Sequence, residues 1–343
     1  SVNANLKSIP GGKPGRSAVD AKGRHASDDL VARQSQEIIV GLSGPVGAGI
    51  KDVRDALAKE LESRGYQPVF IKISELLAQQ AEKLNLKQED APDPSPEFRR
   101  IWGLQSIGNN LRLKLGDDVG AQLAMKDIAF HRANQHPGIP IAEIEPTKVA
   151  YIIDLLKHPK EVALFRSVYR NLFYLVGVLC GYEKRKKNLV ETMPRHLAEQ
   201  LMERDRAESD KNGQQLEKTL QHADFFISNS RHNLDELRFP IARFVGLIHG
   251  DNGLTPTPKE RGMFAAYTAS LRSACLSRQV GAAIVDIAGN LIATGCNDVP
   301  RAGGGLYEPG EGDQRCVFKG GICYNDKHKA KFRDEVVSAL VAE

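Results

Sequence analysis

The chain has 343 residues, of which 41% are hydrophobic and 26% charged, and its formal net charge is +4. This length predicts two domains, and the composition excludes a fibrous or wholly disordered chain. No run of about 18 apolar residues occurs and the first residues lack a secretory h-region, so we expect no membrane partner. Five irregularly spaced cysteines favour a reducing cytoplasm over a disulfide framework.

The first 249 residues divide into a tail and an alternating segment. Residues 1–34 are rich in Gly, Ser, Pro and charge, which is typical of disorder. Between 35 and 249, strand patterns alternate with helical ones, which indicates an α/β fold with a parallel sheet covered on both faces. We expect strands at 38–40, 66–74, 148–154, 171–180 and 223–229. We expect helices at 51–64, 99–116, 121–133, 159–170 and 194–208.

The turn after the first strand is rich in glycine. Gly44 and Gly49 have the spacing of the phosphate-binding pattern G-x-x-x-x-G-K-[ST], but Ile50 stands at the lysine position and Lys51 at the hydroxyl position. Glycines, Gly47 included, let backbone N–H groups approach a phosphate, whereas phosphoryl transfer also needs the lysine and the hydroxyl. A slip of one residue turns a helical side chain by about 100°, so we expect Lys51 not to point where the missing lysine would. We therefore expect these glycines, with Lys51 as a further candidate, to bind a nucleotide without transferring phosphate. A simple tight turn is the alternative.

Other segments of residues 35–249 resemble P-loop nucleoside monophosphate kinases and their relatives. They are LQSIGNNLRLKLGDD (104–118), VAYIIDLLKHPKEVALFR (149–166), RHLAEQLMERDRAE (195–208) and ADFFISNSRHNLDEL (223–237). The resemblance implies that Asp154 organises Mg²⁺ beside the nucleotide, and that Arg195 and Arg204 are lid arginines on phosphate. Both arginines could equally be solvated helix charges. The basic run at 183–188 is expected to be a solvated loop, with phosphate or RNA as its alternative contacts.

A second module is expected beyond residue 249. Residues 250–262 have the Gly, Pro and Thr content of a linker, and a helix is expected at 263–277. A strand, a turn at Ala288–Asn290 and a second strand should follow. Beyond them we expect a Gly-rich irregular stretch at 301–329 and a final helix at 330–343. Because that helix has no stop signal, we expect the chain to end in mid-domain.

The segment RSACLSRQVGAAIVDIAGNLIATGCNDVPRAGGG (272–305) resembles the deoxycytidylate deaminase family. The similarity lies in a strand that begins at Gln279 and in a second strand that leads to Asn297 and Pro300. It implies that Asn297 faces the deoxyribose and that Arg278 faces a phosphate. It also implies that Gln279 and Gly281 shape the strand beneath the pocket. The alternatives are an ordinary turn residue for Asn297 and a polar group at the sheet edge for Gln279.

The chemistry of that family depends on a zinc-bound hydroxide and a glutamate, in the motifs H-x-E and P-C-x-x-C. Neither motif occurs in residues 1–343, so we expect no catalytic residue in this chain and Zn²⁺ ligands beyond residue 343. The chain would then be a fragment or a degenerate protein. Cys316, Cys323 and His328 are the alternative metal candidates, although their spacing matches no established zinc pattern and free thiols are the default.

A P-loop kinase-like domain ahead of the N-terminal part of a cytidine deaminase-like α/β/α domain resembles the anti-phage dCTP deaminases of bacteria. The resemblance implies cytoplasmic, zinc-dependent deamination of dCTP or dCMP, which depletes the nucleotides that a phage needs. It also implies homo-oligomers, and we expect a regulatory nucleotide or small RNA as a further partner. Two alternatives stay open: a P-loop nucleotide kinase and a non-catalytic nucleotide-binding regulator.

Overall fold

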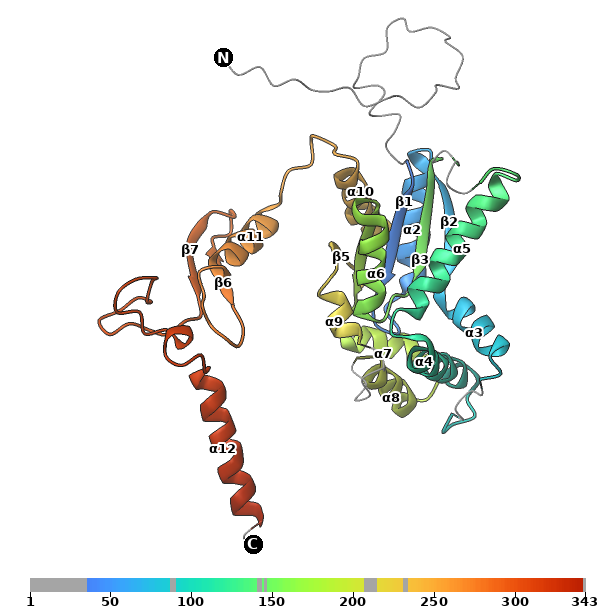
Figure 1. The fold of residues 1–343 in the computed structure, drawn as a ribbon. Helices are drawn as coiled ribbons and strands as arrows, with labels where there is room; N and C mark the ends of the chain where they lie inside the picture. The colour runs from blue at the N-terminus through green and yellow to red at the C-terminus, as the bar shows by residue number, and fades with distance from the viewer. Residues whose placement is uncertain are drawn as a thin grey trace, which may run out of the picture. The chain divides into compact units, whose positions relative to one another are not determined.

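The computed structural model describes residues 36–86, 91–140, 144, 147–206, 215–230 and 234–341 (Figure 1). The tail predicted at residues 1–34 lies outside the described residues. The chain divides into two compact units, residues 1–249 (unit 1) and residues 250–343 (unit 2). Among the helices that the structure describes, none is long and apolar enough to cross a lipid bilayer.

Unit 1 is built on a five-stranded sheet in the order β2-β3-β1-β4-β5, with every neighbouring pair parallel. The strands are β1 (Ile38–Ser43), β2 (Gln67–Lys72), β3 (Val149–Asp154), β4 (Phe173–Leu179) and β5 (Phe225–Ser228). Successive side chains point to opposite faces of a strand, so Ile39 and Val40 enter two different hydrophobic clusters. A strand lies in each of the five predicted segments. The central strands β1, β3 and β4 are apolar and mostly buried, as expected for a sheet covered on both faces, whereas the edge strands β2 and β5 are partly exposed.

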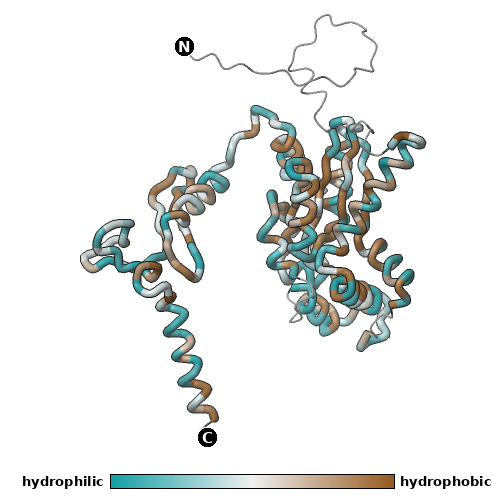
Figure 2. The backbone as a smooth tube through the Cα atoms, viewed as in Figure 1, coloured by the Kyte–Doolittle hydropathy of each residue, from teal (hydrophilic) through white to brown (hydrophobic). Residues whose placement is uncertain are grey.

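Helices cover both faces of this sheet (Figure 1). One face carries α2 (Ile50–Ser63) and α10 (Leu234–Ile248). The other carries α3 (Ile73–Lys83), α4 (Pro96–Leu115), α5 (Val119–Gln135) and α6 (Pro159–Tyr169). The remaining helices of unit 1 are α7 (Tyr182–Val190), α8 (Arg195–Arg206), α9 (Leu216–Leu220) and a short 3₁₀ turn, Arg170–Leu172. Figure 2 shows hydrophobic segments along the sheet and hydrophilic segments on the helices around it.

Two segments of unit 1 differ from the prediction, and the helices α9 and α10 lie in segments for which no element was predicted. The strand expected at 66–74 ends at Lys72, because Ile73 begins α3 and packs with Leu77 and Ala81, at helical spacing, into the core. The basic run at 183–188 is part of α7 rather than a loop, and α7 is anchored by Leu189, which is buried in a third hydrophobic cluster. In both cases the burial of one helical face outweighs the local composition.

Unit 2 contains α11 (Pro258–Ser270), the antiparallel hairpin of β6 (Gly281–Val285) and β7 (Leu291–Cys296), a 3₁₀ turn (Cys316–Phe318) and α12 (Tyr324–Val341). The hairpin and its turn at Gly289, where φ is +82°, confirm the prediction. The helix expected at 263–277 is shifted toward the N-terminus and ends at Ser270. It begins inside the predicted linker because Thr257 and Glu260 form a capping box.

The packing of α11 on the hairpin depends on a glycine. A Cβ added at Gly281 would lie 1.9 Å from the carbonyl oxygen of Ala266, so only glycine fits at this position. Within the described part of unit 2, Ala269 is the one hydrophobic residue that is buried, while side chains such as Ile284 and Ile292 on the two strands are exposed. This unit therefore has little hydrophobic core of its own among its described residues.

Candidate functional site

The turn between β1 and α2, residues 44–49, lies at the carboxyl edge of the sheet, beside its central strand. Gly47 and Gly49 have φ values of +78° and +70°, in the left-handed region that favours glycine. Their N–H groups meet no acceptor among the described residues. A glycine-rich turn that leads into a helix N-terminus is an arrangement that favours an anion.

Side chains from three other segments hold the carbonyl groups of this turn. Asn188 of α7 donates through Nδ2 to the Gly47 oxygen at 2.8 Å. Asn229, which follows β5, donates to the oxygens of Ala48 and Gly49 at 3.0 Å each. Lys157, which follows β3, donates through Nζ to the carbonyl oxygen of Gly44. The shape of the turn is thus fixed by tertiary hydrogen bonds rather than by its glycines alone.

The side chains at the start of α2 supply no cation to the turn. Ile50, at the position of the lysine, is buried, lies against Gly44 and lines the adjoining cavity. Lys51 is exposed and does not line it, because successive residues of a helix differ by about 100° in direction. Lys51 is therefore not among the residues that the structure brings to the turn.

A cation reaches the turn from the segment between β3 and α6 instead. Lys157 Nζ donates to the carbonyl oxygen of Gly44 at 2.8 Å and to Asp205 Oδ1 at 2.7 Å. Asp205, in the last turn of α8, accepts through Oδ2 from the N–H of Val46 at 2.6 Å, and its side chain is 2% exposed. A buried carboxylate thus already accepts a hydrogen bond from a backbone N–H of the turn. Sequence reasoning missed both residues, although Lys157 lies within the quoted motif LLKHPKE.

A cavity of about 240 Å³ adjoins the turn. Besides the turn it is lined by the start of α3, by Leu155, Lys157 and Asp205, and by one face of α4. The α4 side of the cavity consists of Arg100, Ile101, Leu104, Gln105, Gly108 and Arg112, most of which belong to the quoted motif LQSIGNNLR. Gln105 and Arg112 are buried, and the atoms Gln105 Oε1 and Arg112 Nε have no hydrogen-bond partner within the described residues. Polar groups are therefore available on the cavity wall.

Glu161 links this wall to Lys157. Its carboxylate lies 3.7 Å from the guanidinium of Arg112, and its Oε2 accepts from the N–H groups of Lys157 at 2.9 Å and His158 at 3.1 Å. Burial raises the pKa of Glu161, and the charge of Arg112 opposes this shift. The carboxylate of Glu161 therefore positions both the Lys157 segment and the Arg112 side chain.

His158 caps α6 next to Lys157. Its Nδ1 accepts from the N–H of Lys160 at 3.3 Å, and its buried Nε2 has no partner among the described residues. Burial lowers the pKa of His158 to about 4, and the positive charge of Arg112 acts in the same direction. His158 is thus neutral in the folded protein near pH 7.

We expect acid to destabilise unit 1 through His158. The pKa in the fold lies below that of an unfolded histidine, about 6.5, so the contribution to stability is complete above about pH 6.5 and is lost as the pH falls toward about 4. Urea unfolding at several pH values measures this loss. His158→Asn keeps a capping acceptor without the titration and should lose less stability over the same range. An unchanged pH profile would contradict this assignment.

Asp154 lies at the end of β3 but does not line the cavity. Its Oδ2 is 3.5 Å from Nη1 of Arg54, which also lies over the ring of Phe70. Burial raises the pKa of Asp154, and Arg54 opposes that shift. Because this carboxylate faces a cation and position 51 carries no hydroxyl, the residues present do not fit the Mg²⁺ site that the resemblance implies.

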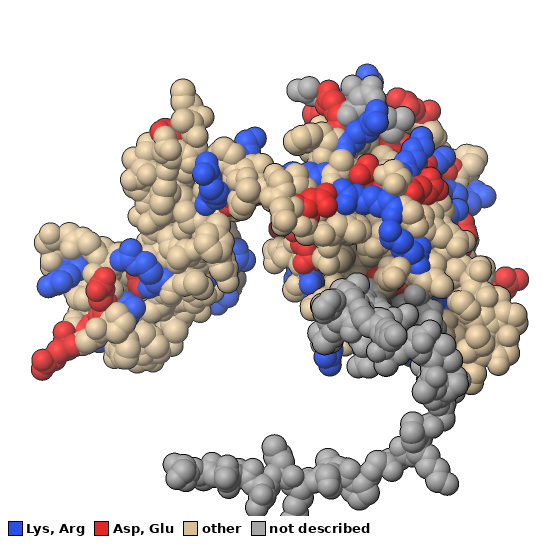
Figure 3. Space-filling view, turned by 90° about the horizontal axis from the view of Figure 1, so that it is seen from above, with Lys and Arg blue, Asp and Glu red and all other residues tan. Residues whose placement is uncertain are grey.

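The two predicted lid arginines lie outside the cavity. Arg195 is 71% exposed and hydrogen-bonded to Glu199, as a solvated helix charge would be. Arg204 stacks on Trp102, with its guanidinium carbon 3.9 Å from the ring centroid, and donates to Ser106 Oγ at 3.1 Å. Arg204 thereby packs α8 against α4. Figure 3 shows acidic and basic side chains interspersed on the face of unit 1 that it views.

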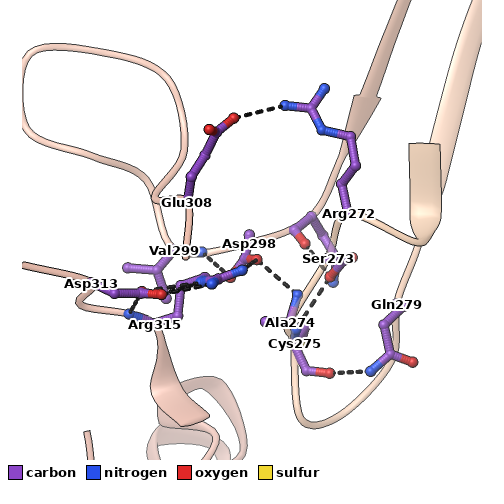
Figure 4. Close-up of polar contacts among 11 residues, drawn as sticks. Arg272, Ser273, Ala274, Cys275, Gln279, Asp298, Val299, Glu308, Asp313 and Arg315 are labelled. Carbon is purple, nitrogen blue, oxygen red and sulfur yellow. Dashed lines mark hydrogen bonds and ion pairs between the residues drawn. The ribbon is translucent and has the colours of Figure 1, made fainter. Parts of the chain in front are cut away.

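In unit 2, the amide of Asn297 binds backbone. Its Oδ1 accepts from the N–H of Val280 at 2.7 Å, and its Nδ2 donates to the carbonyl oxygen of Arg278 at 2.8 Å. Gln279 donates to the carbonyl oxygen of Cys275 at 2.5 Å (Figure 4). The Arg278 side chain is exposed. These contacts favour the structural alternative for Asn297, which braces the segment ahead of β6.

A polar cluster that the sequence did not predict lies next to this segment (Figure 4). Arg315 donates through Nε and Nη2 to Asp313, and Asp298 Oδ2 accepts from the N–H of Ala274 at 2.8 Å. The hydrogen bond from Arg315 holds the pKa of Asp313 below its usual value. Ionic contacts thus hold the Gly-rich stretch at 301–314 where few apolar side chains are buried.

No group of three or more His, Cys, Asp or Glu in the described part of the chain could hold a metal ion. Cys316, Cys323 and His328 are therefore not brought together as a metal site. All five cysteines are free thiols. The described residues do not fit the catalytic zinc ion of a deaminase.

No protein-family model and no curated protein matches the chain. Among solved structures, a gluconokinase from Sinorhizobium meliloti is 12% identical over 63% of this chain and 98% of its own, with a TM-score of 0.34. A shikimate kinase from Bacteroides thetaiotaomicron is 13% identical over 62% and 98%, with a TM-score of 0.32. The Deinococcus radiodurans tunicamycin resistance protein is 11% identical over 61% and 96%, with a TM-score of 0.34.

A likeness this distant carries no argument about activity. The P-loop kinase-like fold of unit 1 is given by its own strand order and by the glycine-rich turn after β1.

Proposed function

We propose that unit 1 binds a nucleotide without transferring its phosphate, and that unit 2 is part of a zinc-dependent deaminase acting on deoxycytidine nucleotides. The observation that carries the first half is the turn after β1. It keeps the left-handed glycines at 47 and 49, but Ile50 fills the lysine position and Lys51 points away. An anion can bind such a turn through backbone N–H groups, whereas transfer needs a lysine and a metal-binding hydroxyl.

The alternative of a P-loop kinase gains one argument from Lys157, because this side chain brings a cation to Gly44. Two observations weigh against it. Asp205 already neutralises Lys157, and Asp154 faces Arg54 rather than the cavity. Binding without transfer is therefore the function that the described residues of unit 1 support best.

The second half of the proposal rests on residues 258–297. They form a helix followed by a hairpin, in the order that the deaminase resemblance implies, with Gly281 packed directly on α11. A two-stranded hairpin is only marginally stable alone, and its exposed Ile284 and Ile292 offer an apolar surface on which a larger sheet could pack. The zinc ligands and the proton-transferring glutamate would have to come from residues other than these 343.

The whole protein would convert dCTP or dCMP to the uracil nucleotide and release ammonia. We further propose, on the resemblance alone, that this reaction takes place in the cytoplasm, depletes nucleotides during phage infection and is carried out by a homo-oligomer. A regulatory nucleotide or a small RNA is the proposed signal for unit 1.

Two measurements test the two halves separately. Equilibrium dialysis of the 343-residue chain with labelled dCTP or ATP should show binding, and γ-labelled ATP with dCMP as acceptor should yield no labelled product. Protein expressed from the whole reading frame should release ammonia from dCTP in the presence of Zn²⁺. Phosphate transfer would contradict the first half, and the absence of ammonia release would contradict the second.

A further inference from the structure

We propose that Asp205 is an internal occupant of the phosphate-binding turn, and that the phosphoryl group of a ligand displaces it to bind Lys157 and Arg112. The proposal rests on the proposed function in one respect, since it concerns the same turn of unit 1. It goes further by naming the side chains that receive the phosphoryl group and the group that must leave.

Asp205 makes the contacts that an anion would make at this turn. Its two oxygens accept from the N–H of Val46 at 2.6 Å and from Nζ of Lys157 at 2.7 Å. Phosphate oxygens accept from the same kinds of donor, with comparable geometry. Because the Asp205 side chain is 2% exposed, these donors are unavailable to a ligand while Asp205 stays in place.

Arg112 supplies the second, independent observation. Its side chain is 4% exposed and lines the same cavity, and its Nε has no hydrogen-bond partner among the described residues. The nearest anion is Glu161, whose Oε1 lies 3.7 Å from Nη2, beyond hydrogen-bond distance. A planar guanidinium with a vacant donor suits the oxygens of a phosphoryl group.

The charges at the cavity also favour an anionic ligand once Asp205 leaves. With Asp205 in place, Lys157 pairs with Asp205 and Arg112 lies 3.7 Å from Glu161, so each of these two cations faces one carboxylate, and the charge of Arg185 also acts on Asp205. Displacing Asp205 leaves one uncompensated positive charge beside backbone N–H groups. A phosphoryl group restores the balance, whereas an uncharged nucleoside does not.

The position of Asp205 makes its displacement feasible. It lies in the last turn of α8, where unwinding removes few helical hydrogen bonds. With Asp205 in place the cavity, at about 240 Å³, is smaller than the roughly 300 Å³ or more of typical small-molecule sites. Removing the carboxylate enlarges the cavity next to the turn. Free phosphate and a nucleotide share the required chemistry, and the experiment distinguishes them.

Asp205→Asn in the full chain tests the proposal, with Glu203→Gln as the matched control. Glu203 lies on the same helix but is exposed and paired with Arg206. Isothermal titration uses inorganic phosphate, dCMP, dCTP and deoxycytidine as probes. Asp205→Asn should bind the phosphate-bearing probes about tenfold more tightly than the wild type and Glu203→Gln do. None of the three proteins, wild type, Asp205→Asn and Glu203→Gln, should bind deoxycytidine measurably. Gains for dCMP and dCTP but not for phosphate would identify a nucleotide as the ligand.

Hydrogen exchange of the wild-type protein supplies a readout that does not depend on the variant folding. Saturating dCTP should speed exchange at residues 201–206, because Asp205 leaves the turn. Unchanged or slower exchange there, or equal affinities in Asp205→Asn and wild type, would overturn the proposal. If the wild type binds dCTP in that case, nucleotide binding by unit 1 survives. If no phosphate-bearing probe binds any of the proteins, both proposals fail.

Discussion

Lys157→Met is expected to destabilise unit 1 by about 3–5 kcal/mol, the usual cost of removing one partner from a buried ion pair. The substitution leaves the carboxylate of Asp205 buried, with the N–H of Val46 as its one remaining donor among the described residues. Urea unfolding followed by circular dichroism measures the change. The double variant Lys157→Met/Asp205→Leu removes both charges and should recover most of the loss, since a well-packed apolar pair can replace a buried ion pair.

Lys160→Met is the matched control for this prediction. Lys160 lies three residues further on and pairs with Asp117, but its side chain is 67% exposed. Exposed ion pairs contribute little to stability because water screens them, so this variant should unfold almost like the wild type. Equal stabilities for Lys157→Met and Lys160→Met would show that the pair on the turn is not structurally important.

Gly281→Ala is expected to separate α11 from the hairpin of unit 2. The added Cβ would lie 1.9 Å from the carbonyl oxygen of Ala266 and 2.5 Å from the N atom of Ser270, and backbone atoms cannot move aside as a side chain can. Overpacking of this kind costs about 1–3 kcal/mol. A unit with little buried apolar surface among its described residues has few other contacts to absorb that cost. Hydrogen exchange should therefore become faster throughout β6.

Gly295→Ala provides the comparison on the neighbouring strand. Nothing lies within 4 Å of a Cβ added at Gly295, so the same change of residue type should leave exchange in β6 and β7 close to that of the wild type. Identical exchange in the two variants would mean that the close approach of α11 at Gly281 does not hold the hairpin.

The sequence predicts the sheet of unit 1 well because buried parallel strands are continuous apolar runs. Its five strands and the turn at Gly44–Gly49 lie where the pattern places them. The helices α3 and α7 were missed for a different reason. Their local composition resembles that of a strand or a charged loop. They can be identified as helices only from the residues that they bury, which are Ile73 and Leu77 in α3 and Leu189 in α7.

The candidate site was predicted only in part, since its key contacts join residues far apart in the chain. Lys157 and Asp205 are 48 residues apart, and Lys157 and Gly44 are 113 apart. No spacing rule predicts such pairs. Conversely, the similarity of segments could assign Lys51 and Arg195 to a site but could not show that both side chains are exposed. A motif fixes the residue type at a position, whereas the direction of the side chain depends on tertiary packing.

One incubation tests the central claim most directly. Protein from the whole reading frame, with Zn²⁺, dCTP, γ-labelled ATP and dCMP as acceptor, is assayed for ammonia, uracil nucleotides and transferred label. We predict ammonia and a uracil nucleotide in equal amounts, with no label on the acceptor. Labelled product without ammonia would contradict the claim and assign the chain to the phosphotransferases.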